Sequence, residues 1–217
     1  MRFIYSLLLA LSVLAGPAEA RVKVLCAVGD SLVAGGPILS GNPGWPSILQ
    51  TRRAGEKFAI INAGVGGYTA AQTLALFNSD LKGKGCTHLA VLACTNDLSA
   101  GTAATTCQTT LNSIVASARE DTSGDPNGIN VTVLTPPPRG GSASWDSTKE
   151  TQRGLLVTSI LAMDADFKVS LEPMAGTGSP VEMAAAYRAA DMLHFNGTLV
   201  TGGTVKVADL VDAAVSW

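Results

Sequence analysis

Apolar residues along the chain form short runs that alternate with longer amphipathic stretches. The short runs are rich in Val, Ile, Leu and Ala and are bounded by Gly, Asp and Pro, a pattern typical of strands buried on both faces. Five strands are expected, at residues 21–28, 57–62, 87–93, 130–135 and 166–171. Five helices are expected, at residues 45–54, 69–81, 104–119, 148–163 and 203–215. This alternation predicts an α/β fold: a three-layer α/β/α, flavodoxin-like arrangement with a five-stranded parallel sheet and helices on both faces.

The first twenty residues have the features of a secretory signal peptide. Arg2 is followed by an apolar run at residues 3–15, a helix-breaking Gly16-Pro17 and small residues at Ala18 and Ala20. We therefore expect residues 1–20 to be a signal peptide and residues 21–217 to form one domain. The run is shorter than the about 20 apolar residues that a membrane span needs, and no later segment is long enough. The mature chain is expected to be secreted (extracellular or periplasmic), without an integral membrane segment.

Composition narrows the class of protein further. With 217 residues, 47% of them hydrophobic and only 15% charged, the chain is unlike a disordered protein, which is poor in apolar groups. Lys plus Arg number 15 and Asp plus Glu number 17, so the net charge is −2. This balance offers no basic surface for nucleic acid, and none is expected as a partner. We expect a monomer.

The four cysteines allow several arrangements. Because export permits disulfides, Cys94 and Cys107, which bracket one loop, are the expected pair, and Cys26 is expected to be a buried thiol within a strand. A metal site built from Cys86, His88, Cys94 and Cys107 is an alternative. It ranks lower because the spacing contains no CxxC or HxxxH knuckle.

Small and polar residues follow several of the predicted strands, where ligands bind in open α/β sheets. They are Ser31 after the first strand, Gly66-Gly67 after the second, Asn96 after the third, and Asp191 and His194 near the last helix. In a flavodoxin-like order the first three strands are neighbours, so these residues are expected to converge. Judged alone, Asp30-Ser31 after a strand is more commonly explained as a helix cap. The convergence of these residues favours a site.

These residue types suit acyl transfer. A serine hydroxyl is a weak nucleophile until a base takes its proton, and His194 could do this for Ser31. Asp191 would orient the imidazole and stabilise its charged form. The backbone N–H groups of Ser31 and Gly67 and the Asn96 amide would stabilise the oxyanion.

Four segments, in this order, resemble the sequence blocks of the SGNH hydrolases, also called GDSL esterases and lipases. They are Gly29-Asp30-Ser31-Leu32, Asn62 to Gly67, Thr95-Asn96-Asp97, and Asp191 with His194. The resemblance extends over residues 24–208 and implies that Ser31 is the nucleophile, that Gly67 and Asn96 donate to the oxyanion, and that His194 and Asp191 complete the triad. It also implies no metal and no organic cofactor.

The sequence departs from the family pattern at three positions near these blocks. Cys94-Thr95 precedes Asn96 where a glycine is usual, Phe195 follows His194 where proline is common, and Tyr68 replaces a small or acidic residue. The triad is unaffected, but these changes make it unsafe to transfer a substrate from relatives.

The expected function is therefore a secreted serine esterase acting on short-chain acyl or lysophospholipid-type esters. The alternative is a carbohydrate O-acetylesterase acting on acetylated polysaccharide. Aromatic residues are only 5% of the chain and form no evident lid, which favours small or water-soluble esters. A non-catalytic domain binding a phosphate-bearing cofactor is a third hypothesis, but Leu32-Val33-Ala34 is too apolar for a phosphate loop and no Gly-rich phosphate motif occurs.

Five other residues carry less specific expectations. His88 begins a strand at the opposite edge of the sheet and is expected to be structural. Trp45 and Trp145 either line the substrate crevice or merely cover the sheet edge. Asn130 and Asn196 begin motifs that are glycosylation acceptors only in a eukaryotic source. We expect the Asn196 motif not to be used, because a glycan there would crowd His194.

Overall fold

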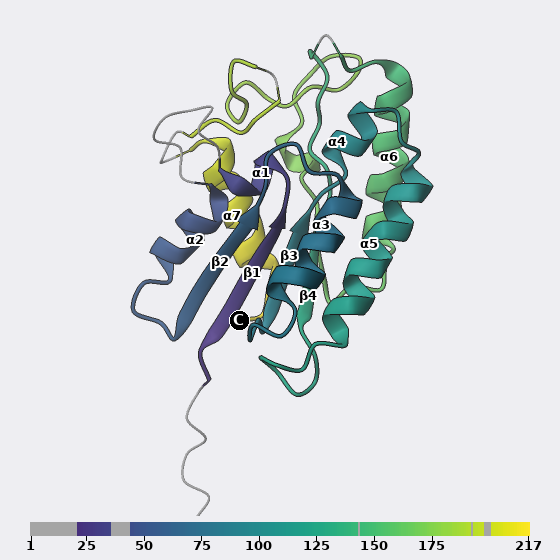
Figure 1. Cartoon of the computed structure of the whole chain (residues 1–217). Helices are drawn as coiled ribbons and strands as arrows, with labels where there is room; N and C mark the ends of the chain where they lie inside the picture. Colours follow the sequence, from purple (N-terminus) through teal and green to yellow (C-terminus); the bar gives the residue numbers. More distant parts are fainter. Residues whose placement is uncertain (1–20, 36–43, 143, 192, 198–200) are drawn as a thin grey trace, which may run out of the picture.

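A five-stranded parallel sheet forms the centre of the protein (Figure 1). The computed structural model describes residues 21–35, 44–142, 144–191, 193–197 and 201–217, so the expected signal peptide lies outside the described residues. The strands are β1 (Lys23–Gly29), β2 (Phe58–Gly64), β3 (His88–Leu92), β4 (Asn130–Leu134) and β5 (Phe167–Val169). Their order is β2-β1-β3-β4-β5, and every neighbouring pair is parallel. The predicted flavodoxin-like fold is confirmed.

Helices cover both faces of the sheet. They are α1 (Ser31–Ala34), α2 (Trp45–Arg52), α3 (Ala70–Leu76), α4 (Thr95–Ser99), α5 (Ala104–Arg119), α6 (Ser147–Leu161) and α7 (Gly203–Ala214). Alternate residues of a strand point to opposite faces. Leu25 and Ala27 of β1 therefore pack in a core with α2 and α7, whereas Cys26 and Val28 pack in a second core with α3, α5 and α6.

The elements that the sequence pattern missed are all short. They are α1, α4 and the 3-10 turn η2 (Glu172–Met174), each too short to show a helical period. The predicted helix 69–81 has the expected Thr69 cap, whose side chain accepts from Gln72 N–H, but it ends in a π-helical segment, η1 (Phe77–Leu81). The predicted strand 166–171 shrinks to the three residues of β5.

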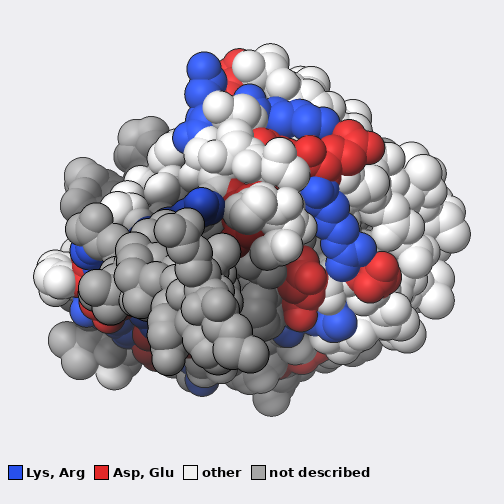
Figure 2. Space-filling view, turned by 90° about the horizontal axis from the view of Figure 1, so that it is seen from below, with Lys and Arg blue, Asp and Glu red and all other residues white. Residues whose placement is uncertain are grey.

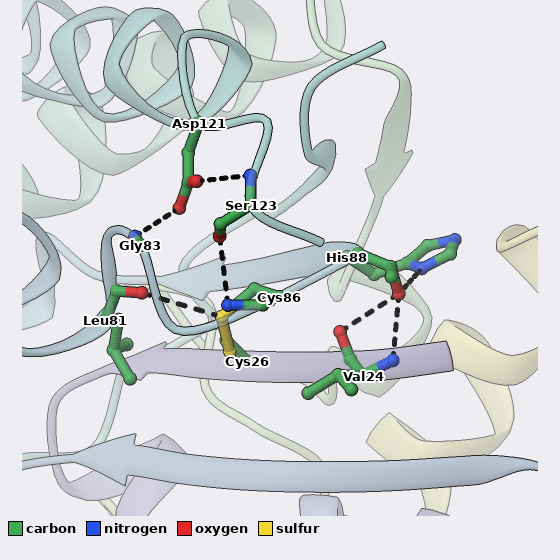
Figure 3. Close-up of a disulfide and its surroundings, with 10 residues drawn as sticks. Val24, Cys26, Leu81, Gly83, Cys86, His88, Asp121 and Ser123 are labelled. Atoms are coloured by element: carbon green, nitrogen blue, oxygen red, sulfur yellow. Dashed lines mark hydrogen bonds between the residues drawn. A yellow bond between two sulfur atoms is a disulfide. The ribbon is translucent and has the colours of Figure 1, made fainter. Parts of the chain in front are cut away.

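The predicted disulfide is wrong. Cys26 of β1 is bonded to Cys86, which lies in the segment leading into β3, whereas Cys94 and Cys107 are buried free thiols (Figure 3). The physical reason is the sheet order: β1 and β3 are neighbours, so a residue just before β3 comes close to Cys26 despite a separation of 60 residues. Because Cys86 is cross-linked, the four-residue metal site proposed as an alternative does not form.

We expect the double variant Cys26→Ala/Cys86→Ala to lose about 2–5 kcal/mol of unfolding free energy, because the cross-link restricts the unfolded chain. Urea unfolding of the double variant and of wild type measures this loss. Cys107→Ala is the matched control, since it removes a buried sulfur without removing a cross-link. Equal unfolding free energies for the double variant and wild type would contradict the prediction.

Charged side chains of both signs lie side by side on the face at the amino ends of the strands (Figure 2). Ion pairs among the described residues include Arg119 with Asp164 and Lys82 with Glu120. Within the described ranges, no helix is both long and apolar enough to cross a membrane.

Candidate active site

The turn after β1 brings Ser31 to the carboxyl edge of the sheet. Gly29 ends the strand with φ +148°, and a Cβ at this position would lie 1.9 Å from the carbonyl oxygen of Leu92. Only glycine therefore allows β3 to approach so closely. Asp30 then caps α1, because its Oδ1 accepts the Leu32 N–H at 2.8 Å. The expected cap is confirmed, and it places Ser31 as the first residue of α1.

Ser31, His194 and Asp191 form a hydrogen-bonded chain. Ser31 Oγ lies 2.9 Å from His194 Nε2, although the two residues are 163 positions apart. On the other side of the ring, His194 Nδ1 lies 2.6 Å from Asp191 Oδ2. An ionised carboxylate only accepts hydrogen bonds, so Nδ1 carries the proton and the Nε2 lone pair faces the serine hydroxyl. This is the protonation pattern that a histidine base requires.

The Asp191 carboxylate is held in its ionised form. Partial burial favours the neutral acid, but hydrogen bonds from the backbone N–H groups of His194 and Leu193 and from the His194 ring stabilise the charge. Together they hold the pKa of Asp191 below its usual value. Its Oδ1 accepts both backbone N–H groups at 3.0 Å, which fixes the loop that carries His194.

The Asn96 amide and the Gly67 backbone, both predicted to donate hydrogen bonds to the oxyanion, lie in one cluster of residues. Asn96, in the first turn of α4, donates from Nδ2 to the carbonyl oxygen of Tyr68 at 2.9 Å. That carbonyl follows Gly67, which has φ +82°, and a Cβ built on Gly66 would lie 4.0 Å from the Ser31 Cβ. The Asn96 amide nitrogen has a second N–H, for which no described residue is an acceptor. The ends of β1, β2 and β3 thus meet around Ser31.

Cys94 has a backbone conformation that glycine adopts readily. Its φ is +78°, and it is the one non-glycine residue with positive φ in the described part of the chain. Such a backbone costs a side-chain-bearing residue about 1–2 kcal/mol. The departure from the family pattern therefore leaves the backbone before Asn96 in the glycine-like geometry, at a cost in stability.

The other aromatic and histidine residues lie outside this cluster. His88 is buried at the start of β3, its Nδ1 lies 2.9 Å from Thr87 Oγ1, and burial, with Lys23 nearby, lowers its pKa. This agrees with a structural role. Trp45 is fully buried in the core, and Trp145 is also buried, donating to Glu150, so the interpretation of these residues as crevice lining is wrong.

Asn196 is committed to internal hydrogen bonds. Its Nδ2 donates to the carbonyl of Ala186 at 2.8 Å and its Oδ1 accepts from the Gly203 N–H at 2.8 Å. A glycan on Nδ2 would disrupt this junction between the His194 loop and α7, which agrees with the expectation that the motif is not used.

Three side chains of the types that can bind a metal ion lie close together near α4. Within the described residues, the ligand atoms of Cys94, Asp97 and Cys107 are within 4.8 Å of one another. Burial, together with Cys107, raises the pKa of the Cys94 thiol well above its usual value, and Asp97 Oδ2 already accepts the Ala70 N–H. This environment disfavours the thiolate that a metal would bind.

Two groups that sequence reasoning did not assign to the site lie beside it. Asp30, considered only as a cap, is buried, and burial raises its pKa to about 6. Arg139 is also buried and interacts electrostatically with both Asp30 and Asp191. The signal for Arg139 was its position just after β4, at the same edge of the sheet.

Comparison with known proteins identifies the family. The family model of the GDSL-like lipase/acylhydrolase family matches residues 27–198, whereas a search of curated proteins finds no match. Similar solved structures include an aryl esterase from M. smegmatis (16% identity, 89% of this chain and 100% of that chain covered, TM-score 0.68). Another is a lipase/acylhydrolase from Enterococcus faecalis (19% identity, 87% and 93% covered, TM-score 0.66).

A carbohydrate acetylesterase from Sinorhizobium meliloti has the same fold (15% identity, 88% of this chain and 99% of that chain covered, TM-score 0.66). At these identities the solved structures show a shared fold, and the family model adds the sequence pattern over most of the chain. The chain therefore belongs to the GDSL-like lipase/acylhydrolase family and is a carboxylic ester hydrolase.

Proposed function

We propose that the protein is a secreted serine esterase that cleaves carboxylic esters through an acyl-enzyme on Ser31. The observation that carries this proposal is the 2.9 Å contact between Ser31 Oγ and His194 Nε2, with Asp191 hydrogen-bonded to the far side of the ring. A hydroxyl, a base within hydrogen-bond reach and a group that orients the base make up an activated nucleophile.

The reaction follows from this geometry. As Ser31 Oγ attacks the ester carbonyl carbon, His194 Nε2 takes the serine proton, and negative charge develops on the carbonyl oxygen. The Ser31 and Gly67 N–H groups and the second N–H of the Asn96 amide would stabilise that charge. His194 then gives its proton to the departing alcohol, leaving an acyl-serine. A water molecule, deprotonated by His194, attacks the acyl group and releases the acid and Ser31.

Two features support export. Residues 1–20 have the pattern of a cleavable signal peptide. The Cys26–Cys86 disulfide is a cross-link of the kind that persists in oxidising compartments and is rare in the cytosol. Secretion accounts for both the signal-peptide pattern and the disulfide. We also expect the secreted enzyme to be a monomer.

The proposed substrates are short-chain acyl or lysophospholipid-type esters. The low aromatic content favours small or water-soluble esters over long-chain triglycerides. Acetyl groups on polysaccharide are the second candidate, in line with the fold shared with the S. meliloti carbohydrate acetylesterase.

A chain-length series tests the substrate class. Each buried CH₂ of an acyl chain can add about 0.8 kcal/mol of binding, but only where the protein encloses it. We expect kcat/KM for p-nitrophenyl esters to be highest from acetyl to butyryl and to fall at least about tenfold by palmitoyl, a loss of about 1.4 kcal/mol. Acetate release from acetylated xylan, measured in parallel, tests the second candidate. A maximum at palmitoyl would contradict a short-chain substrate and would instead favour the lysophospholipid-type esters, whose acyl chains are long.

A further inference from the structure

A cluster of buried polar side chains lies behind the triad. Asp30 belongs to the nucleophile turn, Thr95 and Ser99 are the first and last residues of α4, and Arg139 follows β4. Asp30 is 1% exposed and Arg139 is 4% exposed. Burying a charged group is costly unless partners compensate it, so these two residues need an explanation.

Arg139 holds both ends of α4. Its Nη1 donates to the carbonyl oxygen of Thr95 at 3.2 Å and also donates to Ser99 Oγ. The guanidinium packs over the ring of Trp145, with Cζ 4.8 Å from the ring centroid, which limits its movement. Asn96 lies between the two anchored residues, so Arg139 holds the helical turn from which the Asn96 amide projects.

The charge of Arg139 faces the carboxylates of the site rather than a partner of its own. Among the described residues no carboxylate lies within ion-pair distance of Arg139, whereas the equally buried Arg153 contacts both Glu150 and Glu172. Burial lowers the pKa of Arg139, and the negative charges of Asp30 and Asp191 oppose this effect. The carboxylates that offset the buried charge of Arg139 are thus those of the nucleophile turn and the triad.

Three buried polar atoms at this junction have no hydrogen-bond partner of good geometry among the described residues: Asp30 Oδ2, Thr95 Oγ1 and Arg139 Nε. The Thr95 hydroxyl nevertheless interacts with the Asp30 carboxyl and, like Arg139, lowers its pKa. Asp30, Thr95 and Arg139 therefore form one electrostatic unit that joins the nucleophile turn to α4.

We propose that Arg139 is a positioning residue for ester hydrolysis: its buried guanidinium holds α4, and with it Asn96, against the Asp30–Ser31 turn. This inference rests on the proposed serine esterase function. It differs from a purely structural role because loss of the guanidinium alters the geometry of an oxyanion donor and the charge next to the nucleophile.

Arg139→Met, which keeps the length of the side chain and removes its charge, tests the proposal. A small misplacement of a catalytic group lowers the rate by up to about 100-fold. We expect kcat for p-nitrophenyl acetate to fall about 10–100-fold while KM changes less than about threefold, because the displaced group acts mainly in the transition state. Arg153→Met is the matched control, a buried arginine on α6, expected to lower Tm with little change in kcat.

The pH profile separates positioning from packing. The groups that act on Asp30 are Arg139, Thr95, the Leu32 N–H and His194, and burial raises its pKa to about 6. Arg139 lowers that pKa, so its removal raises it, and Asp30 becomes protonated at higher pH. The acid limb of kcat should therefore move to higher pH in Arg139→Met, because a neutral Asp30 carboxyl is a weaker acceptor for the Leu32 N–H that fixes the start of α1 and with it Ser31. It should stay in place in Arg153→Met and return toward its original position in Arg139→Lys, which restores the charge.

The outcomes are distinct. Wild-type kcat and an unmoved acid limb in folded Arg139→Met, with a Tm loss like that of Arg153→Met, would overturn the proposal. If Arg139→Met does not fold, Ser99→Ala removes one anchor of α4 and is expected to lower kcat about two- to fivefold at constant KM; an unchanged kcat would then overturn it. A wild-type protein without esterase activity would instead refute the proposed function.

Discussion

Replacing Ser31 with alanine is expected to lower kcat for p-nitrophenyl acetate by about 10⁴–10⁶-fold, because the reaction loses its nucleophile and with it the acyl-enzyme route. The Ser31 hydroxyl contacts His194 Nε2, and the cap of α1 is instead the Asp30 carboxyl, which accepts the Leu32 N–H. The fold should therefore be unaffected. Initial rates of purified wild type and variant measure the effect.

The control for this variant is a measurement of its thermal stability. Thermal unfolding of Ser31→Ala should follow that of wild type to within about 2–4 °C, the shift that about 1 kcal/mol produces in a protein of this size. A folded Ser31→Ala protein that retains more than a tenth of the wild-type kcat would remove Ser31 as the nucleophile.

Asp191→Asn is expected to lower kcat by about 10⁴-fold with little change in fold. The amide oxygen of the substituted side chain would still accept the N–H groups of Leu193 and His194, so the loop should persist. Its NH₂ group, however, would donate to His194 Nδ1, which places the ring proton on Nε2. Nε2 could then no longer accept the proton of Ser31, and the charged imidazolium would lose its carboxylate partner.

The matched control is Asp209→Asn, which removes a carboxylate that pairs with Arg52 on the surface. Its kcat should stay within about twofold of wild type, because an exposed ion pair contributes little to the stability of the fold. The measurement is kcat and KM of both variants at neutral pH. A kcat loss for Asp191→Asn of less than about tenfold would mean that Asp191 does not orient His194.

The sequence pattern predicts most of the fold because the elements are long and periodic. Helix α5 occupies the expected residues 104–119, since its apolar stripe repeats every 3.6 residues. The strands also lie where their apolar runs predict, within a few residues, and their order follows from right-handed crossovers. By contrast α1 and α4 are four and five residues long, too short to carry a period.

The convergence of Ser31, Gly67, Asn96 and His194 was predictable for a topological reason. Parallel strands end at one edge, so residues that follow neighbouring strands meet there. The Cys26–Cys86 pairing was not predictable from spacing. The position of Arg139 after β4 places it at the same edge, but the groups that its guanidinium contacts, like the pairing of the two cysteines, are determined by packing between distant segments.

Covalent labelling with a fluorophosphonate tests most directly whether Ser31 and His194 act as one unit. The reagent stands in for the ester carbonyl, and its phosphorus is attacked only by an activated serine. We predict that wild type takes up one phosphonyl group per chain, located on Ser31 by peptide mass spectrometry, and that His194→Ala is labelled at least about 1,000-fold more slowly. Equal labelling rates in wild type and His194→Ala, or a label on any residue other than Ser31, would contradict the account.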